Sequence, residues 1–366
     1  MRSRMIVRIA FACVIVVLAL VLASLRAQDA SRAAAPRLAA FVDRGANLHE
    51  KPAPNFSLVD QYGRTASLAN WRGKVVVLAF VDDRCTTICP LTTQSMVAAL
   101  RLLGPAAARV QLVGVNANPL HVKVQDVLDY SRQHGLDRNW TFLTGSRAQL
   151  AQVWRQYGIA VAIQHGAIDH TPALYVIDQQ GRERRIYVTA SQYAGVGQEV
   201  YVLAKEVASL LPGHVSVAPP SGAVSGISPR ARARLPLASG GNLEIGPGHP
   251  HLYLFLDAWA PGAARQLPLA VAYAAEAKAQ GLPSLVVVDV RNLEASPGAL
   301  PGLLASLPGA SGLPLAVDLS GRVADGYGAQ DIPWYTLTNA QGKVVWAHDG
   351  WPPAGALLKA ARRAGS

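Results

Sequence analysis

The sequence predicts an α/β fold built from two similar units. Apolar β-branched runs alternate with segments of helical spacing, and the same order of elements recurs on both sides of a central segment rich in Pro, Gly and Ser. The length of 366 residues agrees with two domains, at roughly 100–200 residues per domain. Hydrophobic residues make up 51% of the chain and charged residues 16%, which excludes a disordered protein.

The net charge of +11 does not indicate a nucleic-acid partner. Residues 1–40 carry a net charge of +5, and residues 230–234 and 359–363 each carry +3, so the rest of the chain is neutral. A groove for phosphates requires its positive charge on a folded face, so nucleic-acid binding is not expected.

Residues 1–27 are expected to form an N-terminal transmembrane anchor, with the rest of the chain outside the cytoplasm. Ile9–Leu25 are uncharged, and this run is longer than the core of a usual signal peptide, about 7–15 residues. The flanking Leu25-Arg26-Ala27 is a poor cleavage site, so a retained anchor is favoured over a cleaved signal. Cys13 is expected to be an apolar filler within the anchor, and residues 28–49 a tether.

The first unit is expected over residues 50–212. Residues 52–70 alternate around Gly63 in the manner of a β-hairpin, and residues 74–81 form a continuous apolar run typical of a buried parallel strand. Further strands are expected at 110–115 and 173–177, and helices at 90–103, 122–134 and 199–211.

Residues 213–248 are expected to be a linker, and residues 249–366 a second unit. Pro172–Gly181 and Pro333–Gly342 both run from Pro through Asp or Asn to a turn Gly at the same spacing, which indicates a duplicated fold. Strands are expected at 252–256, 285–290, 334–338 and 343–347, and helices at 268–280 and 354–363.

Two of the three cysteines form the motif Cys85-Thr-Thr-Ile-Cys89, directly after the first buried strand. Residues four apart on a helix share one face, and a helix N-terminus favours the thiolate. Two thiolates can hold a soft ion such as Cu(I) or close a disulfide. An inert structural disulfide is the alternative. However, the carboxyl end of a strand is where open α/β sheets place their sites, which favours a functional pair.

His170 is the predicted third member of this site. It precedes the strand at 173–177, on a loop expected to face the two cysteines. A neutral imidazole together with two thiolates suits copper in either oxidation state. His165 on the same loop is the alternative ligand, although an exposed loop histidine is the simpler interpretation of it.

The segment Phe80-Val-Asp-Asp-Arg-Cys85-Thr-Thr-Ile-Cys89-Pro90, with the distant Asp169-His170, resembles the SCO/SenC family. The resemblance covers about residues 50–212. It implies a thioredoxin-like fold, anchoring outside the cytoplasm (the periplasmic side in a bacterium), and copper held by Cys85, Cys89 and His170. It also implies delivery of copper to, or thiol reduction at, the binuclear CuA centre of cytochrome c oxidase.

The chain departs from the family pattern in two places. Asn116-Ala-Asn-Pro119 stands where the family commonly has an acidic Asp-Pro stretch. Pro172 stands where thioredoxins have their cis-proline, which SCO members often lack. The second departure favours disulfide exchange with partner proteins.

The second unit resembles a TlpA-like thioredoxin that has lost its thiols. In Phe255–Pro268, Ala260 and Ala263 occupy the cysteine positions, and Ile332-Pro333 matches the cis-proline loop. This unit alone therefore cannot carry out dithiol chemistry. Three tryptophans are expected either to line a groove for a partner peptide or to pack in the core: Trp259, Trp334 and Trp351.

Together these features predict two tandem thioredoxin-like domains behind an anchor, acting as a copper-binding assembly factor rather than an enzyme. The expected partner is the copper subunit of cytochrome c oxidase or another exported thiol protein. The alternative is a thiol:disulfide oxidoreductase in which Cys85 attacks and Cys89 resolves. A peroxiredoxin is disfavoured because Asp82 stands where that family needs Thr, and a non-catalytic interaction protein remains as a further hypothesis.

Overall fold

The computed structural model describes residues 44–136, 139–164, 166–188, 196–218 and 228–364. The predicted anchor over residues 1–27, with Cys13, lies outside these ranges, as does His165. Within the ranges, no helix combines the length and the apolar character needed to cross a bilayer.

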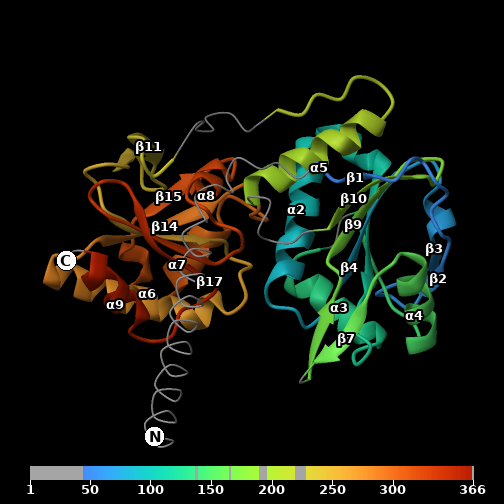
Figure 1. Cartoon of the computed structure of the whole chain (residues 1–366), viewed down its shortest axis with the longest axis horizontal. Coiled ribbons are helices and arrows are strands. Elements are labelled where there is room, and N and C mark those ends of the chain that lie inside the picture. Colours follow the sequence, from blue (N-terminus) through green and yellow to red (C-terminus); the bar gives the residue numbers. More distant parts are fainter. Residues whose placement is uncertain (1–43, 137–138, 165, 189–195, 219–227, 365–366) are drawn as a thin grey trace, which may run out of the picture. The chain divides into compact units, whose positions relative to one another are not determined.

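A six-stranded sheet, in the order β1-β10-β9-β4-β5-β6, organises the first half of the described chain (Figure 1). The strand β4 is parallel to β5, which is parallel to β6, whereas β9 is antiparallel to both of its neighbours, β4 and β10. The strands are Ala46–Asn47 (β1), Val75–Val81 (β4), Val110–Asn116 (β5), Trp140–Leu143 (β6), Ala173–Ile177 (β9) and Glu183–Val188 (β10).

The central strand β4 is buried along its whole length because it contributes to a core on each face of the sheet. Its odd-numbered residues from Val75 to Val81 enter one core and its even-numbered residues from Val76 to Phe80 enter the other. This alternation requires cover on both faces. The helices α2 (Ile88–Leu102), α3 (Val124–Gln133) and α5 (Val196–Leu210) contribute to the first core, and α4 (Arg147–Gln156) to the second.

Two hairpins flank this sheet. The predicted hairpin forms from β2 (Ser57–Val59) and β3 (Thr65–Ser67), with Gly63 in the turn at a φ of +78° that favours glycine. A second hairpin, β7 (Val161–Gln164) and β8 (Ala167–His170), was not predicted, and it carries His170.

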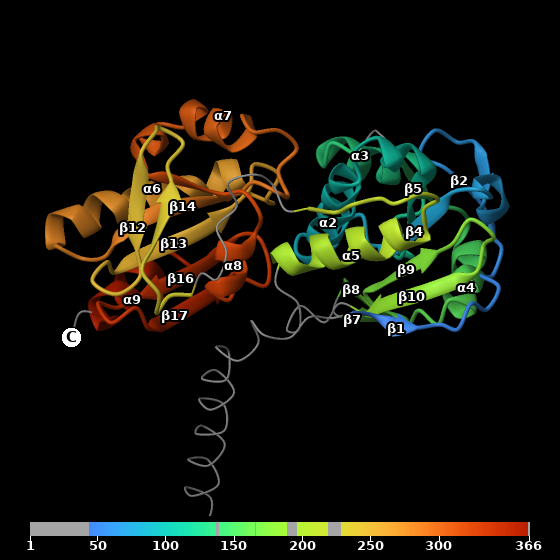
Figure 2. The same cartoon turned by 90° about the horizontal axis from the view of Figure 1, so that it is seen from above.

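A five-stranded sheet, in the order β15-β14-β13-β16-β17, organises the second half (Figure 2). Its strand directions repeat those of β6-β5-β4-β9-β10. The strands are His251–Leu256 (β13), Ser284–Val290 (β14), Leu315–Asp318 (β15), Trp334–Thr338 (β16) and Val344–Asp349 (β17). The helices are Ala263–Gln280 (α6), Ala299–Ser306 (α7), Arg322–Gly326 (α8) and Ala356–Ala364 (α9).

A short hairpin, β11 (Ala233–Pro236) and β12 (Asn242–Ile245), lies inside residues 213–248, the predicted linker. Leu235 and Ile245 are buried, and Leu237 bridges to Ala316 on β15. This part of the segment therefore packs as an edge of the second sheet.

The predicted mixed α/β fold is confirmed. Among the helices, α6 begins at Ala263, so its expected start at Pro268 is wrong. Gly262, in the left-handed conformation, precedes the first turn, and Pro268 lies inside the helix.

Gly114 on β5 lies against the aromatic side chains of β6. A Cβ atom at Gly114 would lie 2.7 Å from the ring of Trp140 and 2.9 Å from that of Phe142. We expect Gly114→Ala to lower the free energy of unfolding by about 1–3 kcal/mol in a urea titration, because the buried rings have to move.

The matched control is Gly302→Ala in α7, where the added Cβ atom meets nothing within 4 Å. This change is expected to raise the free energy of unfolding by about 0.5–1 kcal/mol, since alanine is the better helix former. A Gly114→Ala variant as stable as the parent protein would contradict the close packing of β5 on β6.

Candidate metal and thiol site

Cys85 and Cys89 lie at the carboxyl end of β4, where the chain turns into α2. Cys89 is the second residue of α2, whereas Cys85 precedes the helix by three residues. The expectation that both thiols project from one helical face is therefore wrong for Cys85, which a turn positions instead. The backbone N–H of Cys85 donates to the carbonyl of Asp82 in that turn, at 3.2 Å.

The two thiols are free and form an asymmetric pair. Cys89 is buried, at 3% exposure, and Cys85 is half-buried. The backbone N–H of Cys89 donates to Sγ of Cys85 at 3.5 Å, so the first turn of α2 directs a donor at this sulfur.

This asymmetry separates the acidities of the two thiols. A hydrogen bond from the Cys89 side chain lowers the pKa of Cys85 to about 6, against the opposing effect of burial. The same interaction, together with burial, raises the pKa of Cys89 well above its ordinary value. At neutral pH the pair is therefore a Cys85 thiolate beside a Cys89 thiol.

His170, the last residue of β8, lies against Cys89 although the two residues are 81 positions apart in the sequence. Its Nε2 lies 3.6 Å from Sγ of Cys89, and its Nδ1 lies 3.1 Å from the carbonyl oxygen of Thr171. Because a carbonyl only accepts, Nδ1 carries the ring proton and Nε2 presents its lone pair to the sulfur. The structure thus places Cys89 between the other two predicted site residues, next to Cys85 and next to His170. The three donor atoms do not all lie within 4.8 Å of one another.

Two sulfurs and one imidazole nitrogen form a donor set that suits a soft or borderline transition-metal ion. The carbonyl of Thr171 orients the ring as an outer partner of a metal-binding histidine usually does. The same thiols, at different acidities, are also suited to thiol–disulfide exchange.

An acidic network beside Cys85 was not predicted. Asp83, which is almost fully buried, pairs with Nε of Arg84 at 3.0 Å, and Arg84 also pairs with Asp126 at 3.3 Å. His121 accepts a hydrogen bond from Nε of Arg84 at 2.9 Å. Burial, with the charge of Asp82, raises the pKa of Asp83 to about 6. The signal in the sequence was two acids and an arginine immediately before Cys85.

The Asn116–Pro119 stretch supports this network through neutral amides. Nδ2 of Asn118 donates to Oδ1 of Asp82 at 2.7 Å, and Nδ2 of Asn116 donates to the carbonyl of His121 at 2.6 Å. Where the family commonly has an acidic residue, this chain therefore has amide donors that hold the loop against Asp82.

The two predicted cis-proline positions differ. The Ile332–Pro333 bond is cis, as predicted. The Thr171–Pro172 bond is not cis, so the expectation that Pro172 resembles the thioredoxin cis-proline is wrong.

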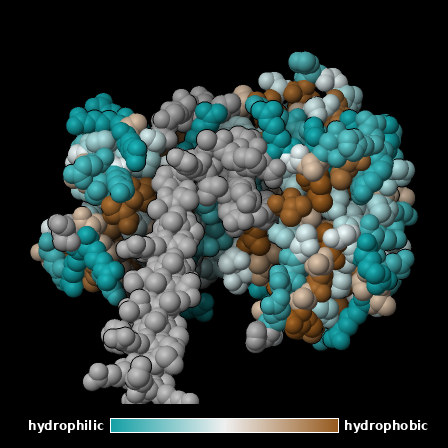
Figure 3. Space-filling view, viewed as in Figure 1, coloured by the Kyte–Doolittle hydropathy of each residue, from teal (hydrophilic) through white to brown (hydrophobic). Residues whose placement is uncertain are grey.

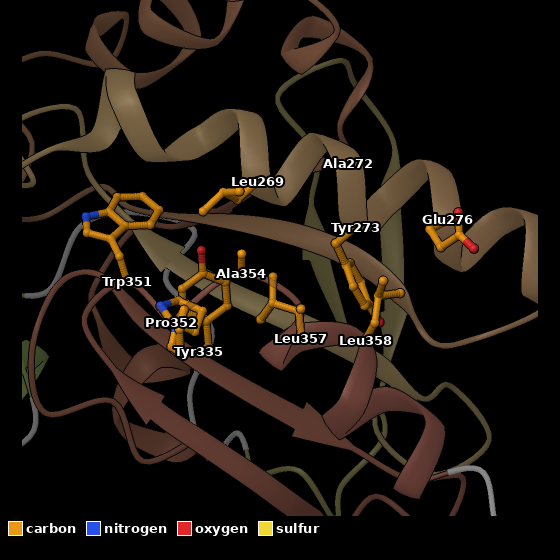
Figure 4. Close-up of a pocket in the computed structure, with 12 residues that line it drawn as sticks. Leu269, Ala272, Tyr273, Glu276, Tyr335, Trp351, Pro352, Ala354, Leu357 and Leu358 are labelled. Carbon is orange, nitrogen blue, oxygen red and sulfur yellow. The ribbon is translucent and has the colours of Figure 1, made fainter.

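One of the three tryptophans that were expected to line a groove or pack in the core lies at a cavity. Trp351 lines an apolar cavity of about 230 Å³ with Leu269, Tyr335 and Leu357 (Figure 4), and its Nε1 donates to the carbonyl of Pro261 at 2.7 Å. The residues that line this cavity do not include the other two tryptophans, Trp259 and Trp334.

On the face of the molecule shown in Figure 3, apolar residues form separate patches among hydrophilic ones. Two of the most exposed large apolar side chains lie on the segments that carry the site. Ile163, 53% exposed, is on β7 of the His170 hairpin, and Leu120, 44% exposed, precedes His121.

Comparison with known proteins agrees with the sequence motifs. The SCO1/SenC family model matches residues 45–203. The chain is similar to the mitochondrial SCO2 homolog of Bos taurus, with 30% identity over 135 residues that cover 35% of this chain and 50% of that protein. It is also similar to the SCO1 protein homolog of Bacillus subtilis, with 24% identity over 137 residues, 36% of this chain and 71% of that protein.

Among solved structures, the chain is similar to Arabidopsis thaliana ScoI with copper bound. The identity is 23% and the TM-score 0.38, over 42% of this chain and 97% of that one. The match to the curated mammalian relatives spans about half of their length.

The family match includes Cys85, Cys89 and His170 and ends before the second sheet begins. The predicted resemblance to the SCO1/SenC family is therefore confirmed for residues 45–203, which the family model matches.

Proposed function

We propose that this chain carries copper outside the cytoplasm and assists assembly of the CuA centre of cytochrome c oxidase. Copper is the cargo, and the chain is a metallochaperone rather than an enzyme. The observation that carries the proposal is that Sγ of Cys89 lies 3.6 Å from Nε2 of His170, while its backbone N–H donates to Sγ of Cys85. The match of the SCO1/SenC family model to residues 45–203 supports it.

The donor set explains how both oxidation states of copper would be accepted. Thiolates favour Cu(I), and an imidazole nitrogen also suits Cu(II). Cys85 is already a thiolate at neutral pH, whereas Cys89 has to lose its proton when the metal binds. Loading therefore releases about one proton per ion at neutral pH.

Release follows from the difference in exposure between the sulfurs. Cys85 is half-buried and reachable, so an incoming thiolate of the recipient can replace it first, while Cys89 and His170 still hold the ion. The proposed recipient is the copper subunit of the oxidase or another exported thiol protein. Residues 1–27, predicted to be a transmembrane anchor, would hold the chain at the membrane in which that subunit is assembled.

The asymmetric thiols favour a second candidate function, thiol:disulfide oxidoreductase. The Cys85 thiolate would attack a partner disulfide, forming a mixed disulfide and releasing one partner thiolate. Cys89 would then attack Sγ of Cys85, which oxidises this pair and completes reduction of the partner. In both functions residues 249–366, proposed to be a thioredoxin-like domain without thiols, would serve as a docking surface.

Anaerobic Cu(I) titration of the reduced protein tests the proposal. We expect one tight site per chain, weakened in Cys85→Ser, Cys89→Ser and His170→Ala. Removing either thiolate should weaken Cu(I) binding by more than the roughly 10–100-fold by which loss of an outer hydrogen-bond partner weakens metal binding. The matched control is His214→Ala, an exposed histidine far along the chain from the motif, which should bind copper like the parent.

A parent protein without a tight Cu(I) site would contradict the carrier function. If the same protein reduced a disulfide substrate with catalytic turnover, the oxidoreductase function would replace it. Tight binding that survives both cysteine substitutions would place the copper elsewhere.

The acidity of Cys85 gives an independent prediction. Its alkylation rate by iodoacetamide should rise with pH and reach half of its maximum near pH 6, since the lowered pKa of the thiol is about 6. Cys89→Ala removes the hydrogen-bond donor and should move this midpoint toward the ordinary value of about 8.5, whereas Cys89→Ser keeps a donor and should move it less. An ordinary midpoint in the parent protein would show that the two thiols do not interact.

A further inference from the structure

A second cluster of ionisable groups lies at the carboxyl edge of the five-stranded sheet. Asp257 directly follows β13, Asp289 is the sixth residue of β14, and Glu294 lies four residues after β14. The two strands are parallel neighbours, with Leu256 paired to Asp289 (Figure 2), so their ends bring the three carboxyl groups together. One oxygen from each group lies within 4.8 Å of the other two.

These carboxyl groups are buried. Asp257 and Asp289 are 0% exposed and Glu294 is 2% exposed. Neither oxygen of Asp257 has a hydrogen-bond partner, and in the described ranges no basic side chain forms an ion pair with it. An unpaired carboxylate in the protein interior is strongly unfavourable.

Asp289 and Glu294 each have one carboxylate oxygen without a hydrogen-bond partner. Oδ2 of Asp289 pairs with Arg291 at 2.6 Å, which leaves Oδ1 unpaired. Glu294 accepts the backbone N–H of Ala258 on Oε1, which leaves Oε2 unpaired. Four buried carboxylate oxygens in one cluster therefore lack a partner.

The surrounding charges do not satisfy these oxygens. The guanidinium of Arg101 contributes positive charge, but its hydrogen bond goes to the carbonyl of Glu294 and not to a carboxylate. Asp318, at the end of β15, adds negative charge, and its own oxygens accept the backbone N–H groups of Val323 and Ala324. Burial raises the pKa of Asp257 well above its ordinary value and that of Glu294 to about 7.

We propose that Asp257, Asp289 and Glu294 bind one hard divalent cation of the Ca²⁺ type. Carboxylate oxygens are the preferred ligands of such ions, at about 2.3–2.6 Å, so oxygens that share one ion lie up to about 5 Å apart. The spacing within this cluster satisfies that limit. Cu(I) is a poor match because it prefers sulfur ligands.

The cation has a structural role in this proposal. It joins the loop after β13 to the loop after β14, and the first of these loops leads through Ala260 to the start of α6 at Ala263. In the second half of the chain, a cation would thus fix the loop that carries alanine at the cysteine positions.

The test is a Ca²⁺ titration of the chelator-treated full chain, purified in detergent, by calorimetry and thermal unfolding. We expect one Ca²⁺ per chain and a midpoint of unfolding that rises with Ca²⁺ concentration. Terbium, a luminescent substitute for Ca²⁺, should be sensitised by Trp259, two residues from Asp257. Asp257→Asn should weaken Ca²⁺ binding by more than about 100-fold.

A stability measurement and a control variant distinguish weaker Ca²⁺ binding from a folding defect. Asp257→Asn replaces a buried carboxyl group without a hydrogen-bond partner by a neutral amide of the same shape, so without Ca²⁺ this variant should unfold at no lower a temperature than the parent. The control Glu276→Gln removes an exposed carboxylate of α6 and should bind Ca²⁺ like the parent. Cu(I) binding should be unchanged in Asp257→Asn, and Ca²⁺ binding unchanged in Cys85→Ser, so this site and the copper site are tested separately.

The proposal is overturned if the parent protein binds neither Ca²⁺ nor Tb³⁺ up to about 1 mM, the weak end of protein calcium sites. Protonation of the carboxyl groups would then offset their burial, and the chelated protein would lose stability as the pH rises from about 4.5 to about 7, the range over which the raised pKa of Glu294 keeps its proton in the folded state alone. Ca²⁺ binding that persists in Asp257→Asn would equally overturn it.

Discussion

The burial of β4 on both faces is the constraint on which the candidate site depends. All seven residues of the strand are buried, so its path through the sheet is set by two cores at once. Because β4 is packed on both faces, the residues that follow it occupy a defined place at the edge of the sheet. There the chain turns at Cys85, and α2 begins at Ile88, directly before Cys89. The fixed strand therefore also restricts the positions of both sulfur atoms.

The junction between β4 and α2 also gives the two thiols different burial and different hydrogen-bond partners. Cys89 sits inside the first turn of α2 and is buried, whereas Cys85 stays in the turn and accepts a hydrogen bond from the helix N-terminus. His170 arrives on a separate hairpin, with its ring oriented by the carbonyl of Thr171. A reachable thiolate, a buried thiol and an oriented imidazole form a site that can accept a soft ion and still release it.

Much of this arrangement could be predicted from the sequence, because long apolar runs and the cysteine spacing are local signals. The strand at 74–81 and the helix at 90–103 correspond to β4 and α2 within two residues. The hairpin that carries His170 was missed, since β7 and β8 are only four residues long each and neither has a buried residue.

Contacts between distant segments could not be predicted. The network of Arg84 with His121 and Asp126 joins residues 37 and 42 positions apart in the sequence. The cluster around Asp257 depends on the parallel pairing of β13 with β14, which sets the ends of the two strands side by side. Neither has a local signature, and the same is true of the turn that separates Cys85 from the helix.

Copper coordination by Cys85, Cys89 and His170 is tested most directly by X-ray absorption spectroscopy of the reduced full chain loaded with one equivalent of Cu(I). Coordination by two sulfur atoms and one imidazole nitrogen, with the nitrogen lost in His170→Ala, is the result that this structure predicts. A copper ion without sulfur ligands, or a spectrum that His170→Ala leaves unchanged, would contradict it.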